Sequence, residues 1–544
     1  MRNIIYICLL MLLLPGLLLA ACGGPAPTPT QTSTATPAAK PTPAPAPTPT
    51  VAAKPAPTPT AVGPQQYGGI LKEGFASTPT VLGYPPLITF GGYVVTSPVL
   101  EALFTFDPAG RFQPRLAKGY QISPDRKALT ISLREGVKFH DGTDCDAEAV
   151  RWNMEQFKVE KVARLVKVDS IDVIDKYTLR LNLKSFSNSL LYDLVMSGGL
   201  MVSPTAVKAN GKEWAYTHPV GTGPFKFASF QRDVSLKYSK FDGYWQKGKP
   251  YLDGVEEVFI ADVTVREMAF KKGELQVVRD PVAKNVPDLK AAGYNIKTMI
   301  NHTNALYPDT VNPDSLFRDK RVREAIEYAI DRKSLARIGF GMWEPAFQVA
   351  YTTRMAYVPN LEVREYNPEK AKQLLASAGY PGGFRTKIIA TTGADKDMLA
   401  ALQKYLSDVG IKVDLDICDA GRFNNYFYKG WQNALLMYNI TTEPNSIDAL
   451  YKALHPQSDY TISLYRPPVL GELLDNADIE TRYDTLKALC QEVVKYCSQE
   501  AILIPVYYTW VCIAEQKTVN GTGIFQDEEA FRMYWNPGNA WISK

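Results

Sequence analysis

The side chains best suited to catalysis or metal binding are scattered along this 544-residue sequence rather than grouped. Its four histidines stand singly, and a lone histidine is more often structural or solvated than a ligand or a base; they are His140, His218, His302 and His455. No HExxH, GxSxG or Walker A motif occurs, and Gly339-Phe340-Gly341 lacks the third glycine of a dinucleotide-binding turn. These features predict a protein that is not an enzyme and holds no cofactor and no metal.

The seven cysteines do not form a metal site either. Five lie beyond residue 100, an odd number with no CxxC spacing: Cys145, Cys418, Cys490, Cys497 and Cys512. Cys490 and Cys497 share the apolar face of a predicted helix, where seven residues separate them by about 10 Å, too far for a bond between them. We expect both to be small buried apolar side chains.

The N-terminus has the layout of an export signal. Arg2 precedes a nearly unbroken apolar run from Ile4 to Ala20, which predicts a secretory signal peptide over residues 1–21. The run ends in Leu19-Ala20-Ala21-Cys22-Gly23, which resembles the lipobox of bacterial lipoproteins, and this resemblance implies lipidation of Cys22. The alternatives are an ordinary cleavage site and a retained membrane anchor.

Residues 22–66 are rich in Pro, Thr and Ala and cannot bury a core, so we expect a disordered tether. Fully stretched, it would reach roughly 100 Å. The sequence does not decide whether it is O-glycosylated. Anchor and tether together predict an exported protein, held by its lipid at the outer face of the cell membrane or in the periplasm.

The rest of the chain has an ordinary globular composition. Overall, 46% of residues are hydrophobic, 21% are charged and the formal net charge is +4. Without a block of like charges, nucleic acid is a poor partner. At about 150 residues per domain the length allows roughly three domains.

Strand and helix signals alternate after the tether. Leu129, Ile131 and Leu133 alternate with polar residues and predict a strand that ends at Glu135-Gly136. The alternation continues over residues 137–140 as far as the turn signal Asp141-Gly142. Thr143 is then the predicted N-cap of a helix whose apolar face includes Val150.

The C-terminal half carries stronger helix signals. Asp319 is the predicted N-cap of a helix over residues 320–331, and Asn367 caps one that starts at Pro368 and ends at Gly379. The alternating glycines Gly221 and Gly223 precede a strand, which indicates unusual φ or close backbone approach. The mixture predicts an α/β protein of several lobes.

Five stretches resemble, in order and spacing, the extracellular solute-binding proteins of family 5, the peptide- and nickel-binding proteins of ABC importers. They are Leu133-Arg134-Glu135-Gly136-Val137-Lys138-Phe139-His140-Asp141-Gly142, Pro219-Val220-Gly221-Thr222-Gly223-Pro224-Phe225, Phe241-Asp242-Gly243-Tyr244-Trp245, Phe317-Arg318-Asp319-Lys320-Arg321-Val322-Arg323 and Tyr366-Asn367-Pro368-Glu369-Lys370-Ala371.

The resemblance implies a two-lobed type II periplasmic-binding-protein-like α/β fold with an extra subdomain. By this analogy lobe I comprises residues 67–97, 218–300 and 511–544, the extra subdomain residues 98–217, and lobe II residues 301–510. A monomer closes on a small solute, in the first instance short peptides, and delivers it to membrane permease subunits. Closure follows when a solute contacts both lobes and so favours the closed form.

The resemblance also suggests where the solute binds. In peptide-binding members an acid of lobe II pairs with the peptide's α-amino group, but the matching position here is Thr441, with Glu443 as a possible substitute two residues on. The aromatic of the same pattern becomes Tyr438. The remaining predicted ligand-binding residues lie near the two crossovers between lobes: Asn304, Tyr307, Tyr508 and Trp510.

Because the expected acid is missing, other solutes stay open: a sugar, an opine or a nickel chelate. Two rival functions also stay open, a sensor or adhesin on the same fold and a secreted hydrolase.

Overall fold

The computed structural model describes residues 65–441, 444–524 and 537–544. The predicted signal peptide, the lipidation site Cys22, the tether and Glu443 lie outside the described residues. The chain from Ala61 onward forms one compact unit. Within the described part, no helix is both long and apolar enough to cross a membrane.

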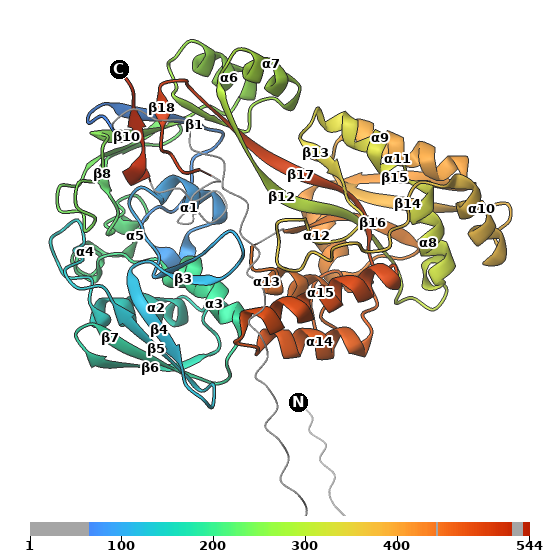
Figure 1. Ribbon diagram of the computed structural model, residues 1–544, viewed down its shortest axis with the longest axis horizontal. Helices are drawn as coiled ribbons and strands as arrows, with labels where there is room; N and C mark the ends of the chain where they lie inside the picture. The colour runs from blue at the N-terminus through green and yellow to red at the C-terminus, as the bar shows by residue number, and fades with distance from the viewer. Residues whose placement is uncertain (1–64, 442–443, 525–536) are drawn as a thin grey trace, which may run out of the picture. The chain divides into compact units, whose positions relative to one another are not determined.

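An 11-stranded mixed sheet runs through the molecule (Figure 1). Its strands are β1 (Ile70–Phe75), β8 (Phe225–Gln231), β9 (Ser235–Lys240), β10 (Gly254–Phe259), β11 (Val277–Arg279), β12 (Asn295–Pro308), β13 (Trp343–Pro345), β14 (Phe384–Thr391), β15 (Ile411–Cys418), β16 (Ala434–Thr441) and β17 (Ile504–Glu515). The order is β15-β14-β16-β12-β17-β11-β1-β10-β9-β8, and β13 pairs with β17 off this path. The long strands β12 and β17 are antiparallel neighbours from Asn295 and Glu515 to Leu306 and Ile504.

Three smaller sheets complete the β structure. They are β2 (Phe104–Phe106) with β3 (Phe112–Pro114), β18 (Val519–Asn520) with β19 (Trp541–Ile542), and a four-stranded sheet of β4 (Ala117–Ile122), β5 (Ala128–Leu133), β7 (Thr178–Leu183) and β6 (Val168–Asp175). β5 confirms the strand predicted from alternation, because Leu129, Ile131 and Leu133 are all buried.

Fifteen α-helices occur among the described residues. They are α1 (Phe90–Thr96), α2 (Ala147–Val159), α3 (Asn188–Val195), α4 (Pro204–Asn210), α5 (Lys212–Ala215), α6 (Val263–Lys271), α7 (Val286–Ala291), α8 (Lys320–Ala329), α9 (Arg332–Ala336), α10 (Pro368–Ser377), α11 (Lys396–Asp408), α12 (Ala420–Lys429), α13 (Ile447–Leu454), α14 (Pro468–Asp478) and α15 (Tyr483–Gln499). Short 3₁₀ turns cover Pro85–Leu87, Ser197–Gly199, Ala283–Asn285, Leu316–Arg318, Arg337–Gly339 and Pro537–Asn539. The predicted mixed α/β class is confirmed.

Most of the predicted helix ends are confirmed. The Asp319 carboxylate accepts from the backbone of Arg321 at 2.8 Å, and the Asn367 side chain accepts from Lys370 at 2.9 Å. Gly379 follows α10 with a φ of +97°, the left-handed conformation that favours glycine. A Cβ at Gly221 would overlap the backbone oxygen of Val99, so the expected close approach is also present.

One predicted helix cap is wrong. The helix α2 is capped by Asp146, whose carboxylate accepts from Ala149 N at 3.0 Å, and not by Thr143. Thr143 instead bonds to Asp141 within the preceding turn. The strand ends at Leu133, close to the predicted end at Glu135-Gly136, and the alternating residues 137–140 form only an isolated bridge between Lys138 and Asp144.

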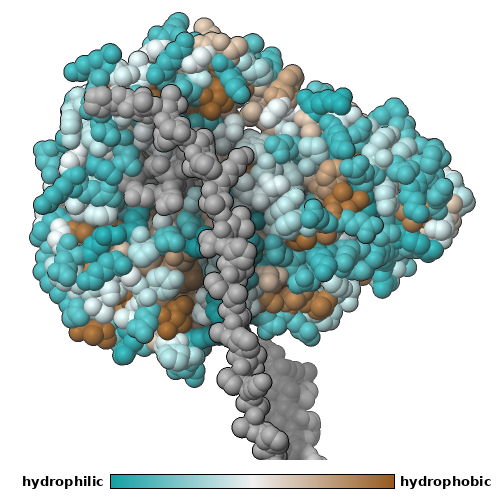
Figure 2. Space-filling view, viewed as in Figure 1, coloured by the Kyte–Doolittle hydropathy of each residue, from teal (hydrophilic) through white to brown (hydrophobic). Residues whose placement is uncertain are grey.

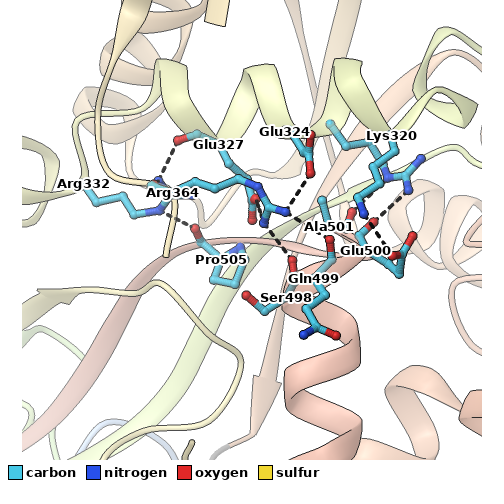
Figure 3. A network of polar contacts seen from close by, with 11 residues as sticks. Lys320, Glu324, Glu327, Arg332, Arg364, Ser498, Gln499, Glu500, Ala501 and Pro505 are labelled. Atoms are coloured by element: carbon cyan, nitrogen blue, oxygen red, sulfur yellow. Dashed lines mark hydrogen bonds and ion pairs between the residues drawn. The ribbon is translucent and has the colours of Figure 1, made fainter. Parts of the chain in front are cut away.

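A half-buried arginine joins the linker before α10 to two helices (Figure 3). Arg364 Nη1 and Nη2 lie 2.8 Å from carboxylate oxygens of Glu327 and Glu324 on α8. The same guanidinium donates to the carbonyls of Ser498 at 2.7 Å and Gln499 at 3.0 Å, at the end of α15. Backbone carbonyls at a helix end have no partner within the helix, so Arg364 caps α15 while it pairs with α8.

The segment that contains α3 contacts the end of α14. Asn188 Nδ2 lies 2.9 Å from the carbonyl of Ala477, 3.1 Å from that of Asp478 and 2.8 Å from that of Glu480. Ser187 donates to the Asp478 carboxylate at 2.9 Å. Asn188 is 2% exposed, so water does not compete for these bonds.

All five cysteines of the described residues are buried and unpaired, as predicted for Cys490 and Cys497. Burial raises the pKa of the Cys490 thiol to about 12. The visible face of the molecule is mostly hydrophilic, with its hydrophobic patches separated from one another (Figure 2).

Candidate functional site

Two adjoining cavities lie along the end of β16. Their volumes are about 310 and 460 Å³, within the usual range of small-molecule sites. Both are lined by Phe427 and Tyr428 of α12 and by Tyr438 and Asn439 of β16. We call them together the β16 cavities.

The register of the central sheet brings the predicted residues of β12 and β16 together. Asn304 is paired with Asn439 across the two strands, and Ala305 is paired with Tyr438. Tyr307 lies two residues beyond Ala305, on the same face as Tyr438, and the two rings meet edge to face with centroids 6.0 Å apart. The structure therefore places three of the predicted site residues, separated by more than 130 positions in sequence, in the walls of the β16 cavities.

Aromatic side chains form most of the cavity wall. Tyr438 lies 4.6 Å from Phe427 and 6.0 Å from Phe423, measured between ring centroids. Phe423 and Phe427 are four residues apart on α12, so they share one face of the helix. Burial raises the pKa of Tyr438, so its hydroxyl stays protonated at neutral pH and can donate a hydrogen bond.

Few charged groups reach the β16 cavities. Asp395 lines the larger one, but its carboxylate is already engaged as the N-cap of α11, where it accepts from Met398. Asp448 and Lys452 line the smaller one and form an ion pair one helical turn apart, at 2.8 Å. An aromatic wall with internally paired charges suits an amphipathic solute rather than a bare ion.

Asn304 has a donor without an acceptor. Its Nδ2 is buried and makes no hydrogen bond with any described residue. A buried amide nitrogen left unpaired costs roughly 1–3 kcal/mol. Because Asn304 lines the larger cavity, an acceptor atom of a bound molecule would satisfy it.

Tyr508 and Trp510 lie in a separate cluster with Ile300, Ala346 and Tyr351. The Tyr508 hydroxyl donates to the carbonyl of Gln348 at 2.8 Å, so this ring supports a loop. Trp510 packs edge to face on Tyr351 at 5.3 Å, and its buried Nε1 has no acceptor among the described residues.

Nothing in this region resembles a metal centre. Across the described ranges, no three His, Cys, Asp or Glu side chains are grouped so that they could hold an ion.

Sequence reasoning missed several wall residues. Trp343 of β13 and Thr391 at the end of β14 line the larger cavity, but each comes from a strand paired elsewhere in the sheet. The four-residue spacing of Phe423 and Phe427 was the one available signal, since it marks an aromatic helix face.

Comparisons of the sequence and of the structure with known proteins indicate the same family and the same fold. Residues 111–461 match the family model described as bacterial extracellular solute-binding proteins, family 5 Middle. The chain is 32% identical over 332 residues to the glutathione-binding protein GsiB of Shigella flexneri serotype 5b (strain 8401). That match covers 59% of this chain and 64% of the relative, so it spans less than two thirds of the curated protein.

Two solved structures extend the likeness over most of the chain. The periplasmic binding protein DppA of Helicobacter pylori, in complex with the peptide STSA, has a TM-score of 0.70 and 23% identity, covering 88% of this chain and 99% of that one. The binding protein AgaA of A. tumefaciens R10, in complex with agropinic acid, has a TM-score of 0.69 and 26% identity over the same shares. The first likeness shows the fold alone.

Proposed function

This chain belongs to the bacterial extracellular solute-binding proteins of family 5, and from that premise we propose that it is the solute-binding component of an ABC importer, with short peptides as its solute. It is a binding protein without a catalytic step. The solute lies in the β16 cavities and is passed to membrane permease subunits.

The unpaired donor of Asn304 is the observation that carries the peptide assignment. A peptide presents a backbone carbonyl at every residue, and one such oxygen would satisfy Nδ2 of Asn304. The rings of Phe427 and Tyr438 would pack on the solute's side chains. Glu443 remains the proposed partner of the peptide's α-amino group, in place of the acid that is missing at Thr441, and Tyr307 remains a wall residue.

The lobe boundaries and the lipid anchor remain proposals as well. The predicted crossovers of the chain between lobes, at 300/301 and 510/511, fall inside β12 and β17, which are neighbouring strands in the middle of the central sheet. Lipidation at Cys22 and the tether over residues 22–66 rest on the sequence. We propose that the protein is a monomer held by its lipid outside the cell membrane.

Native mass spectrometry of residues 61–544 tests the proposal, before and after incubation with glutathione and with a pool of short peptides. We expect bound peptide masses on the wild-type protein. Asn304→Ala removes one hydrogen bond and should weaken binding about 5- to 10-fold. Tyr438→Ala removes a packing surface and should weaken it by roughly 10-fold or more.

Tyr366→Ala is the matched control, because this tyrosine is 43% exposed and lies outside the cavity walls. A folded protein that captures no peptide would contradict the peptide assignment. Equal capture by wild type and Tyr438→Ala would contradict the site.

An opine-like solute is the second candidate. The observation in its favour is the 26% identity to AgaA, whose structure contains agropinic acid. Agropinic acid in the same mass-spectrometric assay distinguishes the two solutes.

A further inference from the structure

A further cavity, of about 340 Å³, lies beside β11 and β1, which follow β17 in the order of the central sheet. It is formed by the end of β1, the loop after it, the start of α1 and the residues that end β11. Its rim is exposed at Ser77, Thr80 and Gly91, whereas Phe75 and Arg279 are buried at its base. We call it the β1 cavity.

Arg279 is the unusual group of the β1 cavity. It ends β11, is 5% exposed, and its guanidinium carbon lies 5.1 Å from the ring centre of Phe75. Its Nε forms an ion pair with Glu73 of the neighbouring strand. Nη1 and Nη2 are buried and have no hydrogen-bond partner among the described residues.

The charges around Arg279 do not use those nitrogens. Glu257 is the cross-strand neighbour of Glu73, and burial raises its pKa well above the ordinary value, which favours the uncharged acid. Arg266 also lines the cavity, but its Nη1 donates to the carbonyl of Ile260 at 2.6 Å. A guanidinium carries five N–H donors, so the four on Nη1 and Nη2 of Arg279 remain available.

Two features of the chain keep this arrangement in place. Gly74 leaves room for Arg266, because a Cβ there would lie 2.9 Å from its Cγ. Asp280, directly after Arg279, has a φ of +47°, a left-handed conformation that costs energy for a residue other than glycine. Such strain is concentrated at functional sites, and here it lies on the rim of the β1 cavity.

We propose that the β1 cavity binds a carboxylate group of the solute through Nη1 and Nη2 of Arg279. The planar fork of a guanidinium matches the two oxygens of a carboxylate, which accept two parallel hydrogen bonds. Arg279 is paired with Ile513 of β17, six residues from Tyr507 in the wall of the larger β16 cavity, so the two sites share one strand and lie about 20 Å apart along it. The inference rests on the proposed function, since it names the chemical class of the same solute.

The test compares acids with their amides on the full chain by isothermal titration calorimetry. The probes are tetra-alanine and its C-terminal amide, and, independently of any peptide, succinate and succinamide. Loss of charged hydrogen bonds should weaken binding of each amide about 10- to 100-fold relative to its acid. In Arg279→Lys, which keeps the charge and the partner of Glu73, we expect acid and amide to bind within about 3-fold of each other.

Two further variants separate the cavity from a general charge effect. Gly91→Leu places a side chain where no atom lies within 4 Å of the Cβ position, so it should fill the cavity and weaken both acids without altering Arg279. Lys237→Met removes one positive charge from β9 and should leave the acid-to-amide ratio unchanged.

The outcomes separate this inference from the peptide proposal. If neither tetra-alanine form binds but succinate binds more tightly than succinamide in the wild type alone, the peptide proposal fails and the carboxylate site stands. If acid and amide bind equally to the wild type, or Arg279→Lys preserves the wild-type ratio, the carboxylate site is refuted.

Discussion

Asn188 joins two segments that lie about 290 positions apart, and its removal should weaken both. Its amide nitrogen lies within 3.1 Å of three carbonyls at the end of α14, among them those of Ala477 and Glu480. The last carbonyls of a helix have no partner within the helix. In Asn188→Ala the carbonyls of Asp478 and Glu480 would lose this donor and that of Ala477 would keep only backbone donors, while water stays excluded because position 188 is 2% exposed.

The magnitude follows from the number of bonds. Two N–H groups shared among three carbonyls, at about 1 kcal/mol for each net hydrogen bond, give about 2–3 kcal/mol once the cost of the unpaired oxygens is included. This corresponds to a 30- to 150-fold increase in local opening, at RT of about 0.59 kcal/mol.

Hydrogen–deuterium exchange measured by mass spectrometry reads this opening directly. We expect faster exchange by that factor in peptides covering residues 186–192 and 475–486 alike. Asn182→Ala is the matched control: its side chain bonds to Ser170 and Asp172 within the four-stranded sheet, so exchange over 475–486 should not change. Faster exchange in residues 186–192 alone, or no change above 3-fold in either peptide, would refute a shared contact.

Three further predictions concern titration, packing and thiols. Burial lowers the pKa of His140 to about 4, and its Nε2 lies 2.9 Å from the carbonyl of Gly223. The unfolded chain therefore binds a proton at this histidine more readily than the folded chain, so the free energy of unfolding falls as the pH drops below 6.5. Between pH 7 and pH 5, the free energy of unfolding measured in urea should fall by about 2 kcal/mol less in His140→Asn than in the wild type. Arg364→Met leaves two carboxylates and two carbonyls without their cation and should lower the free energy of unfolding by about 3–5 kcal/mol. Calorimetry should show this as a fall of several degrees in Tm, and an unchanged Tm would contradict the network. Cys490 and Cys497 should not react with a thiol reagent at pH 8 until urea unfolds the protein, and their reaction in the native state would show that this core opens.

Local signals in the sequence were sufficient for most helix ends. Asp319, Asn367 and Gly379 act through atoms within four residues of themselves, so no distant part of the chain is needed to predict them. The predicted cap at Thr143 was wrong because another acceptor lies nearby: the backbone amide and the hydroxyl of Thr143 both donate to the Asp141 carboxylate. Asp146 caps the helix instead. Alternation alone did not make a strand of residues 137–140, because their backbone bonds run to Gly221 and Thr143 rather than along a ladder.

The candidate site depended on information that a single sequence does not carry. The pairing of Asn304 with Asn439 is a register between strands 135 residues apart, and a shift of one residue would turn every side chain to the other face. The family resemblance supplied Tyr438, and the predicted crossover into lobe II supplied Asn304 and Tyr307. Arg279 gave no such signal, since one arginine at the end of an apolar strand is ordinarily solvent-exposed.

The irregular pairing of β12 explains why a polar side chain can occupy the middle of a central strand. Its register with β17 shifts between Asn304 and Ala305, and again between Ile300 and His302. A bulge re-aims the side chains next to it and is over-represented beside binding and active sites. Thr303 and Ala305 are fully buried on either side, whereas Asn304 is partly exposed and reaches the cavity wall. β12 and β17 continue as a pair to Ile513 of β17, the residue that is also paired with Arg279 of β11. A solute bound at Asn304 and through a carboxylate at Arg279 would therefore be held by one continuous sheet.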